Sequence, residues 1–489
     1  MADDDQAGKP GGKGAVKIEM GSGQSHILLR EDTDPATFQE AVWGRVFNRR
    51  RDLSRLPSAV VRASSIASVK QAVAIAHAMG PGTRVSVRSG GHSWAAWSVR
   101  QDAVLVDLAA LRRMVYDEVS GVVACSPGIT GEELNVFLAE KGKMFAGGHC
   151  PDVGLGGFLL QGGMGWNCKN WGWACESIVG VDVVTADGRE LHCSEVENVD
   201  LFWAARGAGP GFPAIVTEFQ LMTRPLVSMF SSAYLFRAQE CRTALRWVID
   251  VAPTADADTE VVCVAKRSEK TQDVEVIAGF LTFKPNKQQA QEAMRAAHDG
   301  RPVSAKILAF CEETNFANEY LRQREEQPMG YRFYSDNVYV ANDADVPEVL
   351  EEAFTSLPSQ KSFALYFAMN PTSRRPLPNM AHSLHSDHYF SMYSIWVDED
   401  GPDGAGAQES RCLAWVRDTM THVERHSVGS YLGDADFRHR TTRFWGQEQG
   451  DRLRAIRQAW DPDGRICGYL DADDSTGIQG LTNEFGWTS

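Results

Sequence analysis

Two glycine-rich turns carry the residues that could do chemistry in this sequence. The first is Arg88-Ser89-Gly90-Gly91-His92-Ser93, and the second is Cys150-Pro151-Asp152-Val153-Gly154-Leu155-Gly156-Gly157. Glycines adopt positive φ and let backbone N–H groups approach a ligand closely, and successive N–H groups form concave nests that suit phosphate oxygens. His92 offers a ring nitrogen and Cys150 a thiolate. The combination predicts a pyrophosphate-bearing cofactor that is also held covalently.

Other chemistries fit these residues less well. A zinc site would draw on the histidines and cysteines at 92, 149, 150, 168 and 175, but their spacings match none of the usual ligand pairs, so we expect no metal. Nothing in the surrounding pattern favours a Cys–His nucleophile pair. The glycine run 207–211 precedes a strand rather than opening a helix and lacks a third glycine at the spacing of a nicotinamide fingerprint, so we predict a tight loop there.

The elements that position the two turns follow from hydrophobic spacing and turn residues. A β-α-β pattern begins at Pro57, with a strand at 58–62, a helix over 66–76 and a strand at 84–88 that leads into the His92 turn. Strands are also predicted at 103–108, 121–125, 178–186, 190–192 and 215–222, and a helix at 198–205. Thr130 and Glu133 have capping-box spacing and open a helix that ends at Gly142, just before the Cys150 turn.

The pattern changes after Pro225. Longer strands are predicted at 228–236, 261–266, 274–283, 362–369 and 389–397, and helices at 239–250, 287–298, 346–356 and 408–425. This alternation is typical of an antiparallel sheet with a helical layer on one side, and its other face could roof a pocket. Residues 430–489 are loop-rich and then helical over 450–459.

Composition excludes several kinds of partner. A chain of 489 residues is too long for one core. The net charge is −15, and the short cluster at 49–51 is too small for a nucleic-acid surface. No apolar run approaches the ~18 residues of a membrane span. Residues 1–25 are expected to be disordered and contain no secretory signal. The ten cysteines are scattered along the chain, which favours reduced thiols. The reduced thiols and the missing signal together favour a cytoplasmic location; secretion with a removed signal stays open.

Taken together, the motifs resemble those of the vanillyl-alcohol-oxidase/PCMH flavoprotein superfamily, and within it the berberine-bridge-enzyme-like oxidases. Residues 88–93 match the RSGGHS motif of that family, and residues 150–157 match its CPxVGxGG motif. The second glycine cluster at 162–165 and the segments 183–188, 202–207, 215–219 and 445–462 continue the pattern. The resemblance covers residues from about 45 to 225 and from 430 to 470.

The resemblance implies an α+β protein with a two-domain PCMH-type FAD-binding fold, in which an antiparallel-sheet substrate domain is backed by helices. After the disordered residues 1–25, the FAD-binding domain would span 26–225 and the substrate-binding domain 226–429. Residues 430–489 would form a C-terminal segment that returns to the FAD domain.

The resemblance also implies roles for individual residues. FAD would be joined to His92 through its 8α carbon and to Cys150 through carbon 6. Val153 falls at the oxygen-gate position, where a small side chain favours dioxygen as the acceptor. The implied cofactor-binding residues are Arg88, Ser89, Gly90, Gly91, His92, Ser93, Cys150, Val153, Gly154, Gly156, Gly157, Ile215 and Tyr431.

The catalytic base cannot be carried over from the family. Asp434 stands where the catalytic tyrosine of the family is expected, and Met164 stands where the second glycine cluster should carry another tyrosine. A base is needed because hydride transfer from a carbinol carbon requires the hydroxyl proton to leave. Asp434 is our first candidate, since partial desolvation would raise its pKa. The other candidates are Tyr431, Tyr393 and His388.

These inferences predict an FAD-dependent oxidase with bicovalently attached FAD. It would oxidise a small-molecule alcohol, either a sugar or a secondary metabolite, by hydride transfer to the flavin, and dioxygen would reoxidise the flavin to yield hydrogen peroxide. The alternatives are an FAD-linked dehydrogenase or oxidative cyclase and, in another class, a flavin-binding protein without turnover. We expect neither a nucleic-acid nor a membrane partner, and the oligomeric state is open.

Overall fold

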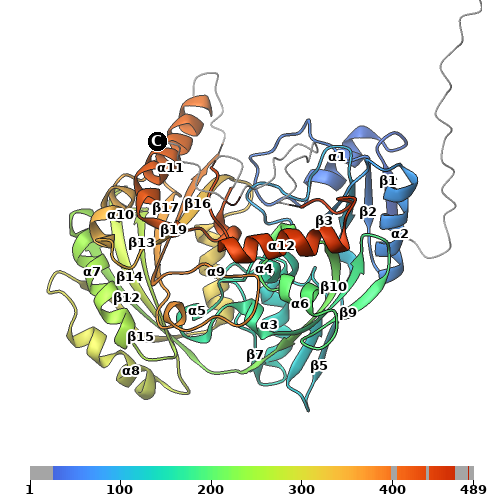
Figure 1. Ribbon diagram of the computed structural model, residues 1–489. Helices are drawn as coiled ribbons and strands as arrows, with labels where there is room; N and C mark the ends of the chain where they lie inside the picture. Colours follow the sequence, from blue (N-terminus) through green and yellow to red (C-terminus); the bar gives the residue numbers. More distant parts are fainter. Residues whose placement is uncertain (1–25, 398–404, 437–439, 469–482, 484–489) are drawn as a thin grey trace, which may run out of the picture.

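In the computed structural model, residues 26–397, 405–436, 440–468 and 483 are described, and they form the α+β fold that the sequence predicts (Figure 1). The expected disordered residues 1–25 lie outside the described residues. So do most of residues 469–489, which end the predicted C-terminal segment.

The first sheet has the order β1-β2-β4-β3, in which β2, β4 and β3 run parallel. Its strands are β1 (His26–Leu29), β2 (Ala59–Arg62), β4 (Val104–Asp107) and β3 (Val85–Arg88). Helix α2 (Ile66–Ala78) packs Val69 and Val73 against this sheet, and α1 (Pro35–Trp43) contributes to a second apolar cluster with Leu105. Strand β3 ends where the His92 turn begins.

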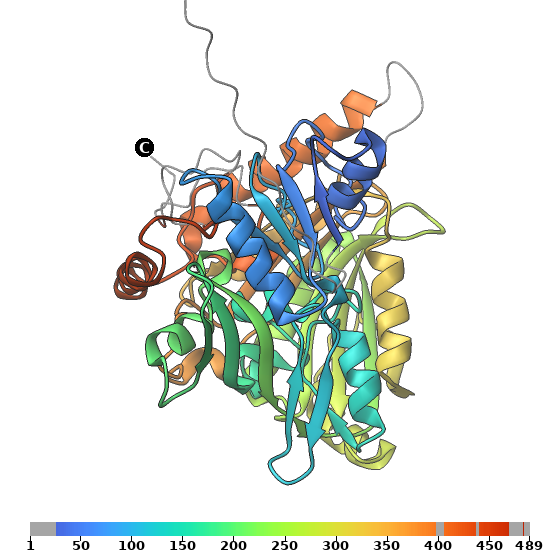
Figure 2. The same cartoon turned by 90° about the vertical axis from the view of Figure 1, so that its right-hand side faces the viewer.

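The second sheet is antiparallel with the order β5-β6-β10-β8-β9 (Figure 2). Its strands are β5 (Met114–Asp117), β6 (Val122–Cys125), β10 (Ala214–Met222), β8 (Ile178–Thr185) and β9 (Glu190–Cys193). Between β6 and β8 the chain forms α3 (Gly131–Ala139), β7 (Lys143–Met144), α4 (Leu155–Leu160) and α5 (Cys168–Trp171). The predicted capping box is present, because Thr130 and Glu133 satisfy each other's backbone N–H groups. The Cys150 turn therefore lies between β7 and α4.

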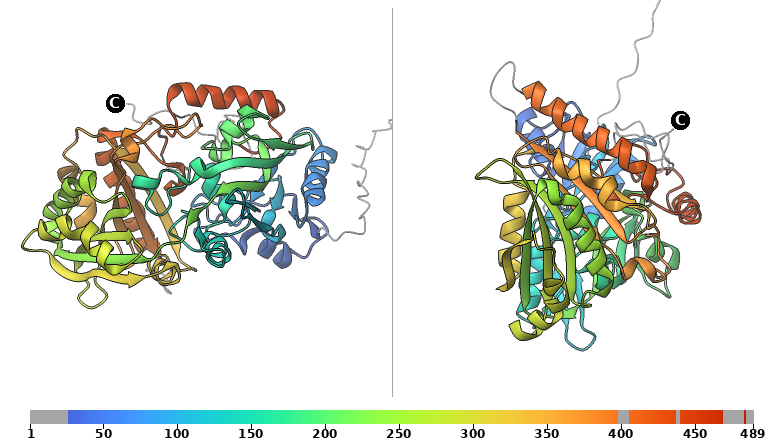
Figure 3. Two further views of the ribbon diagram at one scale, coloured as in Figure 1. Left: turned by 90° about the horizontal axis from the view of Figure 1, so that it is seen from below. Right: turned by 90° about the vertical axis from the view of Figure 1, so that its left-hand side faces the viewer.

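The third sheet has eight antiparallel strands in the order β15-β12-β14-β13-β17-β18-β16-β19. They are β15 (Lys306–Thr314), β12 (Met229–Arg237), β14 (Val274–Phe283), β13 (Thr259–Arg267), β17 (Phe363–Ala368), β18 (His388–Trp396), β16 (Arg332–Val340) and β19 (Ser427–Gly429). Four helices cover its outer face, as the sequence predicts: α7 (Cys241–Val251), α8 (Lys287–Asp299), α10 (Val346–Thr355) and α11 (Ala405–Val423) (Figure 3). Its inner face turns toward the two smaller sheets.

Two helices join the halves of the molecule. Helix α9 (Phe316–Glu326) lies against α3, where the Asn135 side chain donates to Tyr320 Oη at 3.0 Å. Helix α12 (Gln447–Trp460) follows the third sheet but packs against α6 (Val199–Ala204), where Trp460 Nε1 donates to Asp200 at 2.7 Å (Figure 1). After α12, Ile466 forms a parallel bridge with Val85 of β3.

The predicted strands and helices occur close to their expected positions. Several elements were not predicted, among them β1, α1, β5, β15, α9 and β16. Strand β15 is a sheet edge whose side chains do not alternate between buried and exposed. Strand β16 buries Asp336 and Asn337, which a sequence pattern places in a loop. Arg440 satisfies Asp336 with two bonds of 2.7 Å, and the Tyr431 backbone satisfies Asn337.

Candidate active site

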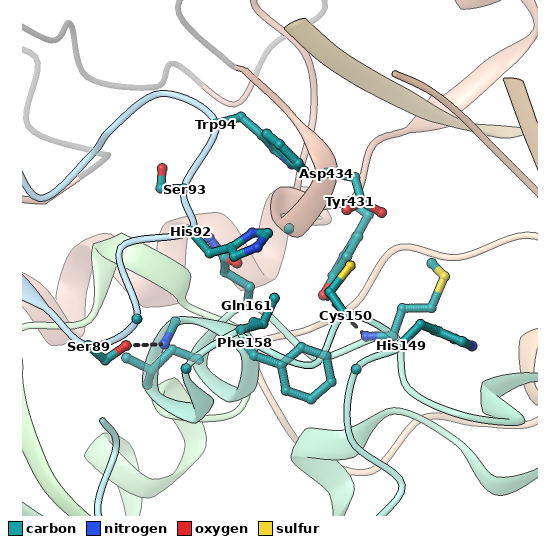
Figure 4. Close-up of a pocket in the computed structure, with 18 of the residues that line it drawn as sticks. Ser89, His92, Ser93, Trp94, His149, Cys150, Phe158, Gln161, Tyr431 and Asp434 are labelled. Atoms are coloured by element: carbon teal, nitrogen blue, oxygen red, sulfur yellow. Dashed lines mark hydrogen bonds between the residues drawn. The ribbon is translucent and has the colours of Figure 1, made fainter. Parts of the chain in front are cut away.

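A cavity of about 500 Å³ lies between the two glycine turns, the inner face of the eight-stranded sheet and helix α9 (Figure 4). The predicted site residues that line it are Arg88, Ser89, Gly90, Gly91, His92, Ser93, Cys150, Val153, Gly154, Gly156, Gly157, Tyr393, Tyr431 and Asp434. The structure therefore brings together residues that are more than 340 positions apart in the sequence.

The two glycine turns are in direct backbone contact. A Cβ added to Gly90 would lie 2.5 Å from the backbone nitrogen of Gly154, and a Cβ added to Gly154 would meet Gly90 at the same distance. Gly91 has φ of +81°, and a side chain there would collide with the Arg45 carbonyl. Between the turns, the Gly157 N–H donates to Ser89 Oγ at 3.4 Å (Figure 4). Only glycine allows the turns to approach this closely.

Arg88 anchors the first turn to the neighbouring strand and helix. Its guanidinium donates to Asp107 Oδ2 and to the Ala41 carbonyl, both at 2.7 Å, and also to the Val42 carbonyl. The side chain is 1% exposed. These bonds commit the guanidinium to the scaffold.

His92 is held between rings and a carboxylate. Its imidazole stacks on Phe47 at 4.0 Å and 19° and lies edge-on to Trp94 at 5.7 Å. Nε2 lies 3.3 Å from Oδ1 of Asp152, which belongs to the Cys150 turn. Burial pushes the pKa of Asp152 up, but the nearby imidazole of His92 helps to bring it below the usual value. The ring is therefore held by Phe47, by Trp94 and by Asp152 of the Cys150 turn.

Cys150 projects into the same space as His92 (Figure 4). All ten cysteines lie in the described part of the chain as free thiols, and only Cys150 is not fully buried. Its Sγ donates to Gln327 Oε1 at 3.4 Å. Burial raises the pKa of the Cys150 thiol, and the carboxylates of Asp152 and Asp434 raise it further. Cys467 also lines the cavity, but it is buried, so Cys150 is the more accessible of the two to a ligand.

Asp434 ends a short 3-10 turn, Leu432–Asp434, and faces the cavity. Tyr389 Oη donates to its Oδ2 at 2.6 Å, and Ser335 Oγ donates to its backbone carbonyl at 2.8 Å. Burial raises the pKa of the Asp434 carboxyl, and the hydrogen bonds from Tyr389 and Tyr393 offset this rise only in part. A carboxylate in this setting has the basicity to accept a proton from a hydroxyl group.

The two tyrosine candidates differ in their partners. Tyr431 Oη accepts the backbone N–H groups of Gly163 and Met164, each at 3.2 Å, so it braces the second glycine cluster. Tyr393 stacks on Phe363 at 4.5 Å and lies edge-on to Trp94. Burial raises the pKa of both hydroxyls, and the Asp434 carboxylate raises it further. Both hydroxyls therefore stay protonated and act as hydrogen-bond partners.

Comparison with known proteins identifies the fold and the cofactor class. Residues 57–194 match the model of an FAD binding domain. The FAD-linked oxidoreductase janO of Penicillium janthinellum is 35% identical over 452 residues, which cover 92% of this chain and 98% of that protein. The chain belongs to the FAD-linked oxidoreductases.

Two further relatives of this oxidoreductase bear on its fold and site. The structure of BBE-like #28 from Arabidopsis thaliana has a TM-score of 0.76 at 17% identity and covers 93% of this chain and 98% of that chain. The carbohydrate oxidase of Microdochium nivale is 36% identical over 177 residues, which are 35% of each protein. The similarity to the carbohydrate oxidase spans about a third of the chain and does not extend to the rest of it.

The glycine turns of the oxidoreductase fit FAD. The cavity runs past both turns, and a Cβ at Gly157 would meet no heavy atom within 4 Å, so the backbone there is open to a ligand. Glycine-flanked N–H groups of this kind suit a pyrophosphate. Among the described residues, no group of three His, Cys, Asp or Glu side chains is arranged to hold a metal ion. No helix of the described chain is long and apolar enough to cross a bilayer.

Two of the predicted site residues lie away from the cavity lining. Ile215 is fully buried in the apolar cluster between β10 and the first sheet. His388 lies on the opposite face of β18 from Tyr389 and Tyr393, and its Nδ1 is 2.9 Å from Tyr366 Oη. We therefore drop His388 from the candidates for the base.

The prediction from sequence missed three features of the oxidoreductase site. Tyr389 contacts Asp434, and its spacing of four from Tyr393 on a strand was an available signal. Gln327 reaches Cys150 from the end of α9, which was not predicted at all. Gly209 and Pro210, assigned to a tight loop, do form a 3-10 turn but also line the cavity.

Proposed function

We propose that this oxidoreductase is an oxidase that holds FAD covalently through both His92 and Cys150 and oxidises a small-molecule alcohol, with hydrogen peroxide as the second product. The observation that carries the proposal is that His92, Cys150 and Asp434 line one cavity. In this proposal residues 26–225 and 430–489 form the FAD domain, and residues 226–429 form the substrate domain.

FAD, when bound, would accept a hydride from the carbinol carbon and pass the electrons to dioxygen. The residues of the chain would position it. His92 and Cys150 approach from different turns, and two tethers fix a ring more firmly than one. The contact of His92 with Asp152 supports a joint role of the two turns in holding the cofactor. Asp152 lies beside the imidazole of the first turn but belongs to the Cys150 turn.

Asp434 would take the hydroxyl proton of the alcohol. Its raised pKa makes it a stronger base than an exposed carboxylate, and it lines the cavity. Tyr389 and Tyr393 would hold the carboxylate in place and stabilise its charge. The contact at 2.6 Å between Tyr389 and Asp434 supports this assignment.

Dioxygen would reach the flavin past Val153. This side chain lines the cavity beside Cys150, and it is small enough to leave room for a diatomic molecule. The name of the Microdochium nivale relative, a carbohydrate oxidase, favours the same acceptor.

The proposal is tested on purified protein in two steps. After acid precipitation the yellow colour should stay with the polypeptide, and intact mass should exceed the bare chain by one FAD. An alcohol panel should then release hydrogen peroxide in air. A bare polypeptide mass would refute the covalent attachment. Substrate-reduced flavin that stays colourless for minutes in air would make the protein a dehydrogenase.

A further inference from the structure

The inner face of the eight-stranded sheet is divided into a polar and an apolar region. Tyr389 and Tyr393 of β18 face the cavity beside Asp434, and they form the polar region. On the other side, β14, β13 and β17 present Ile277, Val264 and Leu365, which are neighbours in one row across the three strands. All three side chains line the cavity and are partly exposed within it.

A second row extends the apolar region. Val262 of β13 pairs with Phe367 of β17, which in turn pairs with Tyr389 of β18. Val262 and Phe367 also line the cavity. The hydrocarbon surface therefore runs without interruption from β14 to the tyrosine that donates to Asp434.

The charged residues at the two ends of β13 already have partners. At one end of β13, Glu260 contacts His149 Nε2 at 3.0 and 3.1 Å and accepts the Asn167 backbone N–H at 2.6 Å. At the other end, Lys266 forms an ion pair with Glu326 of α9. The charges border the apolar region and are engaged with protein groups.

From this arrangement we infer the substrate class: an alcohol whose hydroxyl group is carried on an apolar ring skeleton, and not a sugar. The inference rests on the proposed function for the role of the hydroxyl, which would meet Asp434 and Tyr389. The ring skeleton would lie on Val262, Val264, Ile277 and Leu365. Apolar pockets with a few convergent polar groups bind such ligands well.

A sugar fits this surface poorly because it carries a hydroxyl on nearly every carbon. Each hydroxyl left without a partner against the aliphatic rows weakens binding by about 5- to 150-fold. Each buried methylene of a hydrocarbon ring instead strengthens binding by about fourfold. The cost of unpartnered hydroxyls and the gain from buried methylenes both favour the apolar alcohol, since they act on the same contact surface.

The test measures binding separately from turnover. Terpineol is a tertiary alcohol with no hydrogen on its carbinol carbon, so it binds without reducing flavin; menthol is a secondary alcohol of similar size. Each alcohol, and cellobiose as the sugar, is titrated into the oxidised flavin-loaded enzyme without oxygen. The readouts are the shift of the visible flavin spectrum for binding and its bleaching for reduction.

We expect terpineol and menthol to bind at least about 10-fold more tightly than cellobiose. Val264→Thr, which keeps the side-chain shape but adds a hydroxyl, should weaken terpineol binding by about 10-fold. Ile277→Thr repeats the test on the next strand. The control is Val115→Thr on β5, where the valine is 47% exposed and lies outside the cavity lining.

The outcomes separate the two proposals. Tighter binding of cellobiose, no shift with either alcohol, or unchanged terpineol affinity in both cavity variants would overturn the apolar assignment. If cellobiose then bleached the flavin, the proposed oxidation of an alcohol by the flavin would stand. If terpineol bound as expected but no alcohol of the panel bleached the flavin, the oxidase proposal would fail while the apolar assignment stood.

Discussion

Replacing Asp434 by Asn isolates the proposed base. The amide has almost the same shape and can still accept the hydrogen bond that Tyr389 donates at 2.6 Å. It cannot take a proton from a hydroxyl group. General-base catalysis typically contributes at least about 100-fold, which corresponds to about 2.7 kcal/mol of activation free energy. We therefore expect flavin reduction by an alcohol substrate to slow by at least about 100-fold.

The pH dependence follows from the direction of the pKa shift. Burial raises the pKa of Asp434, so the carboxylate is lost, and reduction slows, as the pH falls through a value above that of an ordinary aspartate. A hydrogen bond to a charged group is worth about 1.5–3 kcal/mol. Tyr389→Phe should therefore lower the ionised fraction on the acidic limb by about 10- to 150-fold, with a smaller effect on the alkaline plateau.

The assay is anaerobic stopped-flow reduction of the flavin across the pH range, which excludes the reaction with dioxygen. Thermal unfolding provides the control. A carboxyl with a raised pKa binds more protons when folded, so its contribution to stability falls as pH rises through that window. Asp434→Asn should thus unfold at no lower temperature than the parent at neutral pH. Parent-like reduction by this variant would refute the assignment and direct attention to Tyr393 and Tyr431.

Three further predictions concern the cofactor. His92→Ala and Cys150→Ala should each retain one covalent link, and the double variant should release FAD on acid denaturation; intact mass reads this directly, and loss of both links in each single variant would contradict it. Val153→Ile should slow reoxidation by dioxygen more than reduction by substrate, measured as two separate stopped-flow rates. Gly154→Ala places a methyl carbon 2.5 Å from a backbone nitrogen of the other turn and should lower covalent FAD content, whereas Gly82→Ala, with open space around it, should not.

Local chemistry explains why the scaffold was predictable. The strand 84–88, the capping box at Thr130 and the two glycine turns each depend on neighbouring residues, so their pattern is visible in the sequence. The turns need glycine because they pack closely: a Cβ added at Gly90 would lie 2.5 Å from the backbone nitrogen of Gly154. The unpredicted β16 shows the limit, since its buried Asp336 is stable only because Arg440, 104 residues away, pairs with it.

The surroundings of the base could not be predicted in the same way. Strand β18 is buried along its whole length, because helices cover one of its faces and the other face points toward the cavity. Its sequence therefore shows no alternation that tells His388 from Tyr389, although they face opposite sides.

The sequence by itself thus determined the cofactor class, the two glycine turns and the order of most elements, because motif residues, glycine conformation and hydrophobic period are local properties. Only the tertiary structure decided that Tyr389 donates to Asp434 from 45 residues away, that Gln327 reaches Cys150, and that an aliphatic surface faces the cavity. These contacts depend on strand register and on packing between distant segments, which no local pattern encodes.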